Sequence, residues 1–146
     1  MSSAAAWVFR EERLRGEPVP VTAEPHPVNV VLVDDNHHHR IPLLRALRAA
    51  GYNVLHAADG ARGEDLFLTS LREPEALIAC AEMRRMSGFE LARRIRSTLP
   101  GIAVLLMSRS AIDCGFPVIE EPFTPEELTH RLAQLLAEAR SPACAE

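Results

Sequence analysis

The fold of this chain is decided by residues 28–36, Val-Asn-Val-Val-Leu-Val-Asp-Asp-Asn. Val30–Val33 is a run of three valines and one leucine without a turn residue, which predicts a strand buried on both faces, as in a parallel sheet. Asp34 and Asp35 follow at the carboxyl end of this strand, the edge at which open α/β sheets place their chemistry. Adjacent acids there are costly unless a cation, a hydrogen-bond donor or water compensates them. The alternative is a solvated Asp-Asp turn that caps the next helix.

The composition is that of one domain with some excess at its ends. The chain has 146 residues, 47% of them hydrophobic, and its formal net charge of −4 argues against nucleic acid as a partner. All 16 basic residues are arginine, so no lysine can serve a site here. The three cysteines form no Cys-x-x-Cys pair, which argues against a disulfide scaffold or structural zinc and favours a reducing, cytoplasmic location. The early apolar run Ala4–Phe9 is too short to span a membrane.

Strand and helix patterns alternate along the chain. Four prolines within Glu17–Pro27 predict an extended linker, so we expect an N-terminal extension over residues 1–27, a folded domain over 28–139 and a tail over 140–146. The expected strands cover residues 28–33, 52–57, 76–80, 102–107 and 116–119, and the expected helices end near Gly51, Arg72, Leu99 and Ala139. This alternation predicts an α/β fold with a doubly wound parallel sheet.

Five short motifs, in this order and spacing, resemble the receiver domain of two-component response regulators. They are Val-Leu-Val-Asp-Asp-Asn at 31–36, Ala-Ala-Gly-Tyr at 49–52, Met-Arg-Arg-Met-Ser-Gly-Phe-Glu-Leu at 83–91, Leu-Leu-Met-Ser at 105–108 and Glu-Pro-Phe-Thr-Pro-Glu-Glu-Leu at 121–128. The resemblance implies a flavodoxin-like (CheY-like) fold with a five-stranded parallel sheet in the order 2-1-3-4-5. The segment 28–139 is therefore expected to be receiver-like.

In that family an aspartate at the end of the third strand accepts a phosphoryl group and an acid pair holds Mg²⁺. A Ser or Thr ends the fourth strand, and a lysine before a Pro-Phe pair neutralises the phosphate. The resemblance assigns the acid pair to Asp34 and Asp35, and the switch hydroxyl to Ser108. The phospho-acceptor position falls on Cys80, and the lysine position falls on Glu121.

These two substitutions argue against phosphorylation. In the family's reaction a carboxylate oxygen attacks the phosphoryl donor while metal and lysine absorb the charge. Cys80 supplies neither that oxygen nor a third anionic metal ligand, and Glu121 replaces a cation by an anion. Glu82 is close by, but its position matches a loop residue that gives the metal a backbone carbonyl, so we do not expect it to be the acceptor. We predict no covalent phosphorylation and at most weak Mg²⁺ binding at Asp34 and Asp35.

The crossover between the fourth and fifth strands is too short for an ordinary helix. Only the seven residues Arg109–Gly115 separate Ser108 from the strand expected at Phe116. A helix takes about 11 residues and its connecting loop about two to six more. We expect the fourth helix of the family to be shortened or missing. The surface on which the family presents its phosphorylation signal must then differ here.

The carboxylates of Asp34, Asp35 and Glu121 are expected to converge, with a neutral thiol between them. Two carboxylates ~5 Å apart repel by about 3 kcal/mol at an effective dielectric near 20, so something must compensate. Arg109 is one candidate, because its guanidinium can bind a carboxylate bidentately. The alternative is that Arg109 points to solvent. The resemblance also implies a cis peptide bond between Glu121 and Pro122.

The histidines and the cysteine suggest two further hypotheses. His37-His38-His39 would point in three directions on a starting helix, so at most one or two could share a metal ion with Asp35. The alternative is that they are solvated helix-start residues. Cys80 could act as a redox switch, because its sulfinic form would resemble aspartate in shape and charge. Against this, a thiol at a strand end beside carboxylates is more typical of a small buried hydrophobe that oxidises slowly.

The predicted function is that of a stand-alone, atypical response-regulator receiver domain. It would be no enzyme but a protein-interaction or adaptor module in signal transduction. The chain leaves no room for an output domain, so output would pass through a histidine kinase or a downstream signalling protein, with a homodimer left open. One alternative is a metal- or redox-responsive sensor that uses Asp34, Asp35, Cys80 and a histidine. The other is a hydrolase or phosphatase that uses the acid pair, although no glycine-rich phosphate loop and no nucleophile beyond Cys80 are present.

Overall fold

The computed structural model describes residues 27–140; the expected N-terminal extension up to residue 26 and the tail from residue 141 lie outside these residues. The strands are β1 (Asn29–Val33), β2 (Asn53–Ala57), β3 (Ala76–Cys80), β4 (Ala103–Ser108) and β5 (Val118–Glu120). The helices are α2 (His37–Ala49), α3 (Gly60–Thr69), α4 (Gly88–Thr98) and α5 (Pro125–Arg140). None of these helices is long and apolar enough to cross a membrane.

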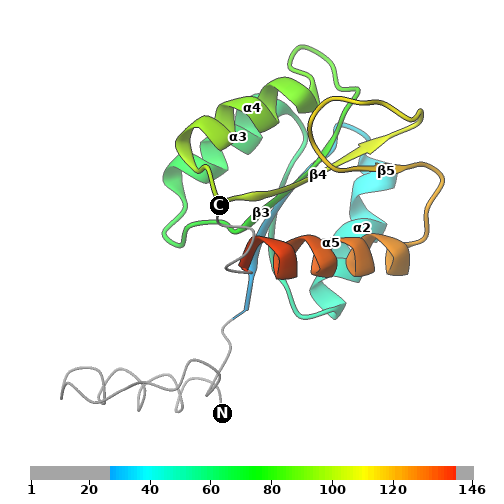
Figure 1. The fold of residues 1–146 in the computed structure, drawn as a ribbon, viewed down its shortest axis with the longest axis horizontal. Coiled ribbons are helices and arrows are strands. Elements are labelled where there is room, and N and C mark those ends of the chain that lie inside the picture. Colours follow the sequence, from blue (N-terminus) through cyan, green and yellow to red (C-terminus); the bar gives the residue numbers. More distant parts are fainter. Residues whose placement is uncertain (1–26, 141–146) are drawn as a thin grey trace.

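The strands form one parallel sheet in the order β2-β1-β3-β4-β5 (Figure 1). This confirms the predicted flavodoxin-like arrangement. In the register of the sheet, Cys80 at the end of β3 pairs with Met107, and Ser108 at the end of β4 pairs with Glu120. The carboxyl ends of the inner strands therefore meet at one edge.

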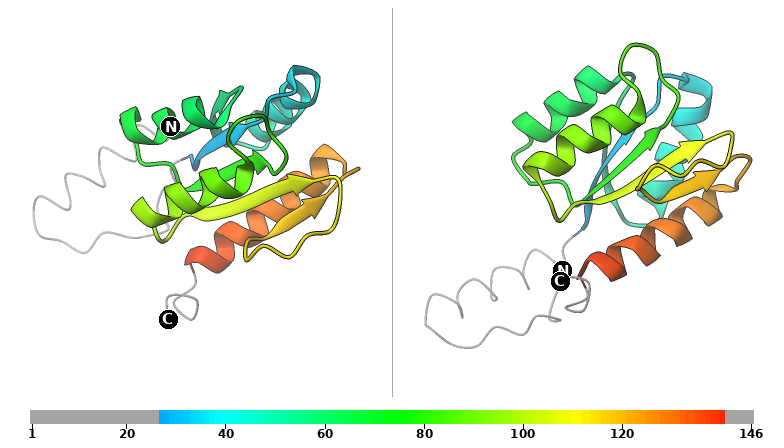
Figure 2. Two further views of the ribbon diagram at one scale, coloured as in Figure 1. Left: turned by 90° about the horizontal axis from the view of Figure 1, so that it is seen from above. Right: turned by 45° about the horizontal axis from the view of Figure 1, so that its top comes forward.

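Helices cover both faces of the sheet, with α2 and α5 on one face and α3 and α4 on the other (Figure 2). Alternate side chains of β1 point to opposite faces. Val30 and Leu32 pack with the helices α2 and α5, whereas Val31 and Val33 belong to the core beneath α3 and α4. The unbroken apolar run in β1 is explained by burial on both faces.

No helix lies between β4 and β5, where residues 109–117 form an irregular loop, so the prediction that this crossover helix is shortened or missing is confirmed. Cys114 and Phe116 of this loop pack against the core under α3 and α4. The guanidinium of Arg96 lies 5.1 Å from the centroid of the Phe116 ring. The short loop thus covers part of the face that a helix would otherwise cover.

Among the element boundaries that differ from the predicted ones, two have clear local reasons. Helix α3 ends at Thr69 instead of Arg72, because Ser70 adopts an extended conformation (ψ 135°) and its Oγ donates to the Arg72 carbonyl (2.6 Å). Strand β5 begins at Val118, two residues later than expected, because Pro117 has no N–H to contribute to the ladder.

Candidate functional site

The carboxyl edge of the sheet brings together the side chains that the sequence assigned to one site. Asp34 and Asp35 follow β1, Cys80 ends β3, Ser108 ends β4 and Glu121 follows β5. Cys80 lies within electrostatic range of both Asp34 and Glu121. Of the three acids expected around the thiol, Asp34 and Glu121 act on Cys80, whereas Asp35 bonds the loop after β3.

Asp34 is the buried member of the acid pair, with only 1% of its surface exposed. Its Oδ2 contacts Nδ1 of His39, and its Oδ1 accepts a hydrogen bond from the backbone N–H of Asn36 (2.9 Å). The guanidinium of Arg40 donates from Nη1 to the Asp34 backbone carbonyl (2.6 Å). The groups that compensate Asp34 therefore come from the start of α2.

The cap of α2 explains why His39 reaches this position. The Asn36 side chain accepts hydrogen bonds from the backbone N–H groups of His38 (3.0 Å) and His39 (3.3 Å), which fixes the helix start directly after the acid pair. Side chains in a helix lean toward its N-terminus, so His39 in the first turn points back to Asp34. Its ring also meets Phe123 edge to face, with centroids 5.9 Å apart.

Arg40 is a buried cation that connects α2 with strand β2 and with Asp34, the residue directly after β1. Besides its bond to Asp34, its Nε donates to Nδ1 of His56 on β2 (3.2 Å), and its Nη2 lies 3.3 Å from Nδ1 of His37. Partial burial lowers the pKa of His56, and the positive charge of Arg40 acts in the same direction. A neutral His56 ring is the form that can accept the Arg40 hydrogen bond.

Asp35 is exposed. Whereas Asp34 is held by the start of α2, Asp35 is held by the loop between β3 and α4. Its Oδ2 accepts a hydrogen bond from the backbone N–H of Arg84 (3.3 Å). In the same loop Arg85 has a positive φ of 66°, and the Met86 N–H donates to the Arg84 carbonyl (2.7 Å). Such a γ-turn is rare for a residue other than glycine.

Cys80 is held as a neutral thiol. Burial raises its pKa to about 12, and the negative charges of Asp34, Glu82 and Glu121 act in the same direction. Its Sγ donates to the Glu82 backbone carbonyl (3.3 Å). Since the thiolate is the form that attacks electrophiles, binds metals and is oxidised, Cys80 is poorly suited to all three tasks at neutral pH.

Ser108, at the switch position, is completely buried and already has a carboxylate partner. Its Oγ donates to Oε2 of Glu82 (2.7 Å) and accepts a hydrogen bond from the backbone N–H of Ser110 (3.2 Å). Glu82 comes from the loop after β3, so this bond ties the loop to the end of β4.

Arg109 does not take the compensating role considered for it. Its side chain is exposed, and within residues 27–140 it forms no ion pair with a carboxylate. This favours the alternative in which it points to solvent, because His39 already contacts the buried Asp34. Glu121 is half-buried, its backbone N–H donates to the Ser108 carbonyl (2.7 Å), and the peptide bond to Pro122 is cis, as expected.

The donor set at this edge fits a Mg²⁺ ion poorly. Mg²⁺ prefers oxygen ligands in octahedral geometry. Here His39 engages the Asp34 carboxylate, and Cys80 is a protonated thiol in place of a third anionic ligand. Across the part of the chain that the structure describes, no three His, Cys, Asp or Glu side chains are grouped to hold a metal ion.

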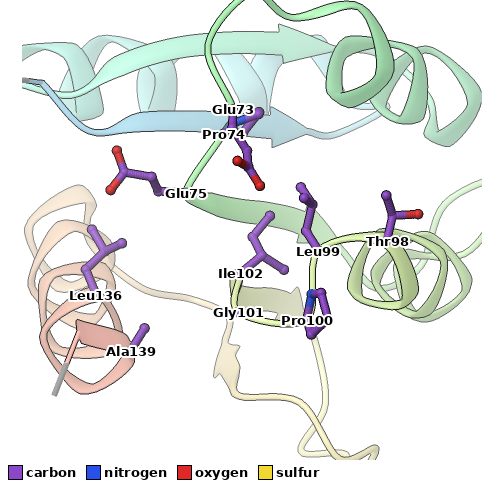
Figure 3. Close-up of a pocket in the computed structure, with 10 residues that line it drawn as sticks. All are labelled: Glu73, Pro74, Glu75, Thr98, Leu99, Pro100, Gly101, Ile102, Leu136 and Ala139. Carbon is purple, nitrogen blue, oxygen red and sulfur yellow. The ribbon is translucent and has the colours of Figure 1, made fainter. Parts of the chain in front are cut away.

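A cavity of about 440 Å³ lies at the opposite edge of the sheet, where β3 and β4 begin (Figure 3). Leu99, Ile102 and Leu136 contribute to its apolar walls, and its only titratable side chains are Glu73 and Glu75. Neither the thiol nor the imidazole that accompanies the carboxylates of the acidic edge is found among its lining residues, so the acidic edge is the candidate functional site.

The chain belongs to the response regulator receiver domain family, whose model matches residues 30–133. Response regulator MprA of Mycobacterium sp. (strain KMS) is 32% identical over 119 residues, which cover 75% of this chain and 51% of that protein. Response regulator MprA of Mycobacterium bovis (strain BCG / Pasteur 1173P2) is 30% identical over 128 residues, which cover 82% and 55%. This chain spans about half the length of these curated relatives.

Solved receiver structures share the fold. The chemotaxis response regulator CheY4 of Vibrio cholerae is 26% identical, with a TM-score of 0.66 over 75% of this chain and 98% of that one. The receiver domain of the hybrid histidine kinase CckA is 28% identical, with a TM-score of 0.66 over 74% and 98%. A response regulator receiver protein from Sinorhizobium medicae WSM419, at 22% identity and a TM-score of 0.71 over 78% and 98%, is similar in fold alone.

The roles of three residues of the site were not predicted from the sequence: His39 and Arg40 hold Asp34, and Glu82 holds Ser108. A signal for His39 was present, since an Asn36 cap sets the helix start and thereby the direction of each histidine. The Glu82 contact depends on the path of an irregular loop, for which the sequence has no periodic pattern.

Proposed function

We propose that this receiver domain works without phosphorylation on aspartate, as a protein-interaction or adaptor module in a two-component signalling system. The observation that carries the proposal is Cys80 at the phospho-acceptor position. Its thiol, whose pKa burial raises to about 12, offers no carboxylate oxygen to a phosphoryl donor. By its site chemistry the domain is then no enzyme, because Cys80 is also the only nucleophile considered for the hydrolase alternative.

The charges around Cys80 support the same proposal. Phosphoryl transfer needs cations that absorb the charge of the transferred group. Glu121 contributes a negative charge at the lysine position, and His39 engages the carboxylate of Asp34. We therefore propose that Asp34 and Asp35 bind Mg²⁺ only weakly and that their role is structural.

The Ser108 hydroxyl supports a single, fixed conformation of the edge. In this chain the hydroxyl at the switch position bonds the carboxylate of Glu82 without any added group. A carboxylate from the chain thus supplies the negatively charged acceptor that a phosphoryl group would otherwise bring. The domain would then present one surface permanently, instead of switching between two.

The partner proposed for this surface is a histidine kinase or a downstream signalling protein. The loop 109–117 stands where the family has a helix, so the surface beside β5 differs from that of a receiver domain with the helix. A partner that reads this face need not recognise an ordinary receiver. Self-association of the chain through the same face is the competing outcome.

The chemistry is tested by incubation with acetyl phosphate and Mg²⁺, followed by intact-mass measurement. We expect no phosphoryl adduct, whereas an ordinary receiver domain treated in parallel becomes modified. An acid-stable, base-labile adduct would contradict the proposal, most directly if it mapped to Glu82.

The adaptor role is tested by affinity capture from the native host. We expect the wild-type chain to retain a specific protein and the double variant Asp34→Ala, Asp35→Ala to retain less of it. His38→Ala is the matched control, because His38 is exposed and does not contact the acid pair. Capture of nothing but further copies of this chain would replace the adaptor by a homodimer.

A further inference from the structure

A second cavity, of about 520 Å³, lies between the start of α3, the loop after β3 and α4. Four arginines line it: Arg62, Arg84, Arg85 and Arg94. They outnumber its two carboxylates, those of Asp59 and Glu90. The cavity is thus a positively charged hollow on a chain whose formal net charge is −4.

Two of the four guanidinium groups, those of Arg84 and Arg85, form no ion pair within residues 27–140. Nε of Arg62 lies 3.6 Å from Asp59 Oδ2, and Arg94 pairs with Glu90 (3.2 Å) and Glu64 (3.4 Å). Arg84 and Arg85 are exposed, and their side chains pair with no other residue in the range 27–140. Exposed ion pairs such as that of Arg62 are weak and can rearrange around a ligand.

The loop presents these two arginines from a fixed backbone. The γ-turn places Arg85 at a φ of 66°, a strained conformation that tends to occur where function requires it. Met86 packs directly on the start of α3, since a Cβ added to Gly60 would lie 2.9 Å from its Sδ. The cavity therefore combines charged walls with the apolar, polarisable surface of Met86.

We infer that this cavity binds a small molecule that carries two or more phosphate charges, of about the size of a nucleoside diphosphate. Guanidinium groups match phosphate oxygens in bidentate geometry. The volume falls within the range of small-molecule sites, about 300–1,000 Å³. Met86 and Ala61 offer an apolar surface for the uncharged part of the ligand.

Binding here would give the domain a non-covalent input, which goes beyond the proposed adaptor function. The backbone N–H of Arg84 donates to Asp35 Oδ2 (3.3 Å), so the loop that lines the cavity also borders the acidic edge. A ligand that orders Arg84 and Arg85 would therefore change the position or the hydrogen bonding of the Asp35 carboxylate.

Calorimetric titration of the full chain with three probes tests the ligand class. We expect ADP and pyrophosphate to bind, with affinity that falls as salt is raised, and adenosine not to bind. Binding of adenosine as tight as that of ADP would overturn the inference, as would the absence of heat with both charged probes.

Paired variants test the location. Arg84→Gln with Arg85→Gln should weaken ADP binding by about tenfold or more, because two charge-assisted contacts are lost. Arg45→Gln with Arg72→Gln removes the same charge from exposed positions outside the cavity and should change the affinity by less than about twofold. Equal weakening by both pairs would show attraction to net charge alone and overturn the site.

Amide NMR shifts at Met86 and Asp35 on addition of ADP to the wild type give a second test, which does not depend on any variant folding. Unshifted amides at these two residues would overturn the site.

Discussion

Asp34 is a buried carboxylate whose compensating groups all come from the next six residues of the chain. Asn36 supplies a backbone donor, His39 an imidazole and Arg40 a guanidinium directed at the Asp34 carbonyl. A buried carboxylate without such partners is strongly unfavourable. The start of α2 therefore serves both as a helix cap and as the charge balance of the site.

Removal of the His39 ring should destabilise the fold because it leaves Asp34 short of a partner. We expect His39→Ala to lower the free energy of unfolding by about 1–3 kcal/mol, the usual cost of an unsatisfied buried polar group. Urea denaturation in metal-free buffer measures this value. The control His38→Ala, at an exposed position, should stay within about 0.5 kcal/mol of the wild type. Equal stabilities of the two variants would show that Asp34 does not depend on His39.

The raised pKa of Cys80 predicts that its thiol reacts slowly with alkylating reagents. In a variant whose other cysteines are replaced (Cys114→Ser, Cys144→Ser), alkylation of the folded protein reports Cys80 alone. At pH 8 the thiolate fraction falls about 1,000-fold as the pKa rises from 9.0 to about 12, but a more basic thiolate is also more nucleophilic, so the reaction should be at least about 30-fold slower than in the urea-unfolded protein. Because the folded pKa lies above the unfolded one, the thiol's contribution to stability is present below about pH 9 and is lost as the pH rises toward 12. Comparable rates in the folded and unfolded protein would contradict this.

At the scale of elements, the loop between β3 and α4 joins the separate parts of the site. Its backbone bonds Asp35 after β1, and its Glu82 carboxylate bonds Ser108 at the end of β4. The loop returns closely against β3, since a Cβ on Gly88 would lie 2.3 Å from the Cys80 carbonyl oxygen. Only glycine permits this approach, which places the start of α4 directly beside the acceptor position.

A double-mutant cycle tests the bond between Glu82 and Ser108. Glu82→Ala and Ser108→Ala should each destabilise the fold, and the double variant should lose about 1 kcal/mol less than their sum. The value is modest because Glu82 is exposed. Glu82→Ala combined with Ser97→Ala, which is bonded to Arg94 on α4, should be additive. An additive cycle for Glu82 and Ser108 would remove the support for a fixed conformation.

The elements were predictable wherever burial fixes a pattern. The apolar runs of β1 and β3 gave their positions closely, because both strands lie between two helical layers. The end of α3 was missed because a hydrogen bond from Ser70 competes with the helix. Strand ends also placed Asp34, Cys80 and Ser108 at one edge correctly. Side-chain partners were not predictable in the same way, since the choice between Arg109 and His39 depends on where each chain segment turns.

The whole molecule carries two charged sites of opposite sign at one end. At the acidic edge, Asp34 contacts His39 and Glu82 bonds Ser108. In the arginine cavity beside it, the guanidinium groups of Arg84 and Arg85 form no ion pair within residues 27–140. The loop after β3 borders both. Under the two proposals, the cavity would bind a small molecule and the surface beside the acidic edge would contact a protein.

Mg²⁺ should have little effect on the stability of the whole molecule, because the ion must compete with His39 for Asp34. A ligand that binds only the folded state at a concentration equal to its Kd adds about 0.4 kcal/mol to the free energy of unfolding. At about 10 mM Mg²⁺ we therefore expect the wild type to gain less than about 0.4 kcal/mol over a sodium chloride control of equal ionic strength. His39→Ala should gain more, because its Asp34 carboxylate is open to the ion, and Asp34→Asn should gain nothing. Denaturant titrations of the three proteins with and without Mg²⁺ measure these differences. A wild type that gains as much as His39→Ala would mean that the metal site is intact, and the case against phosphorylation would then rest on Cys80 and Glu121 alone.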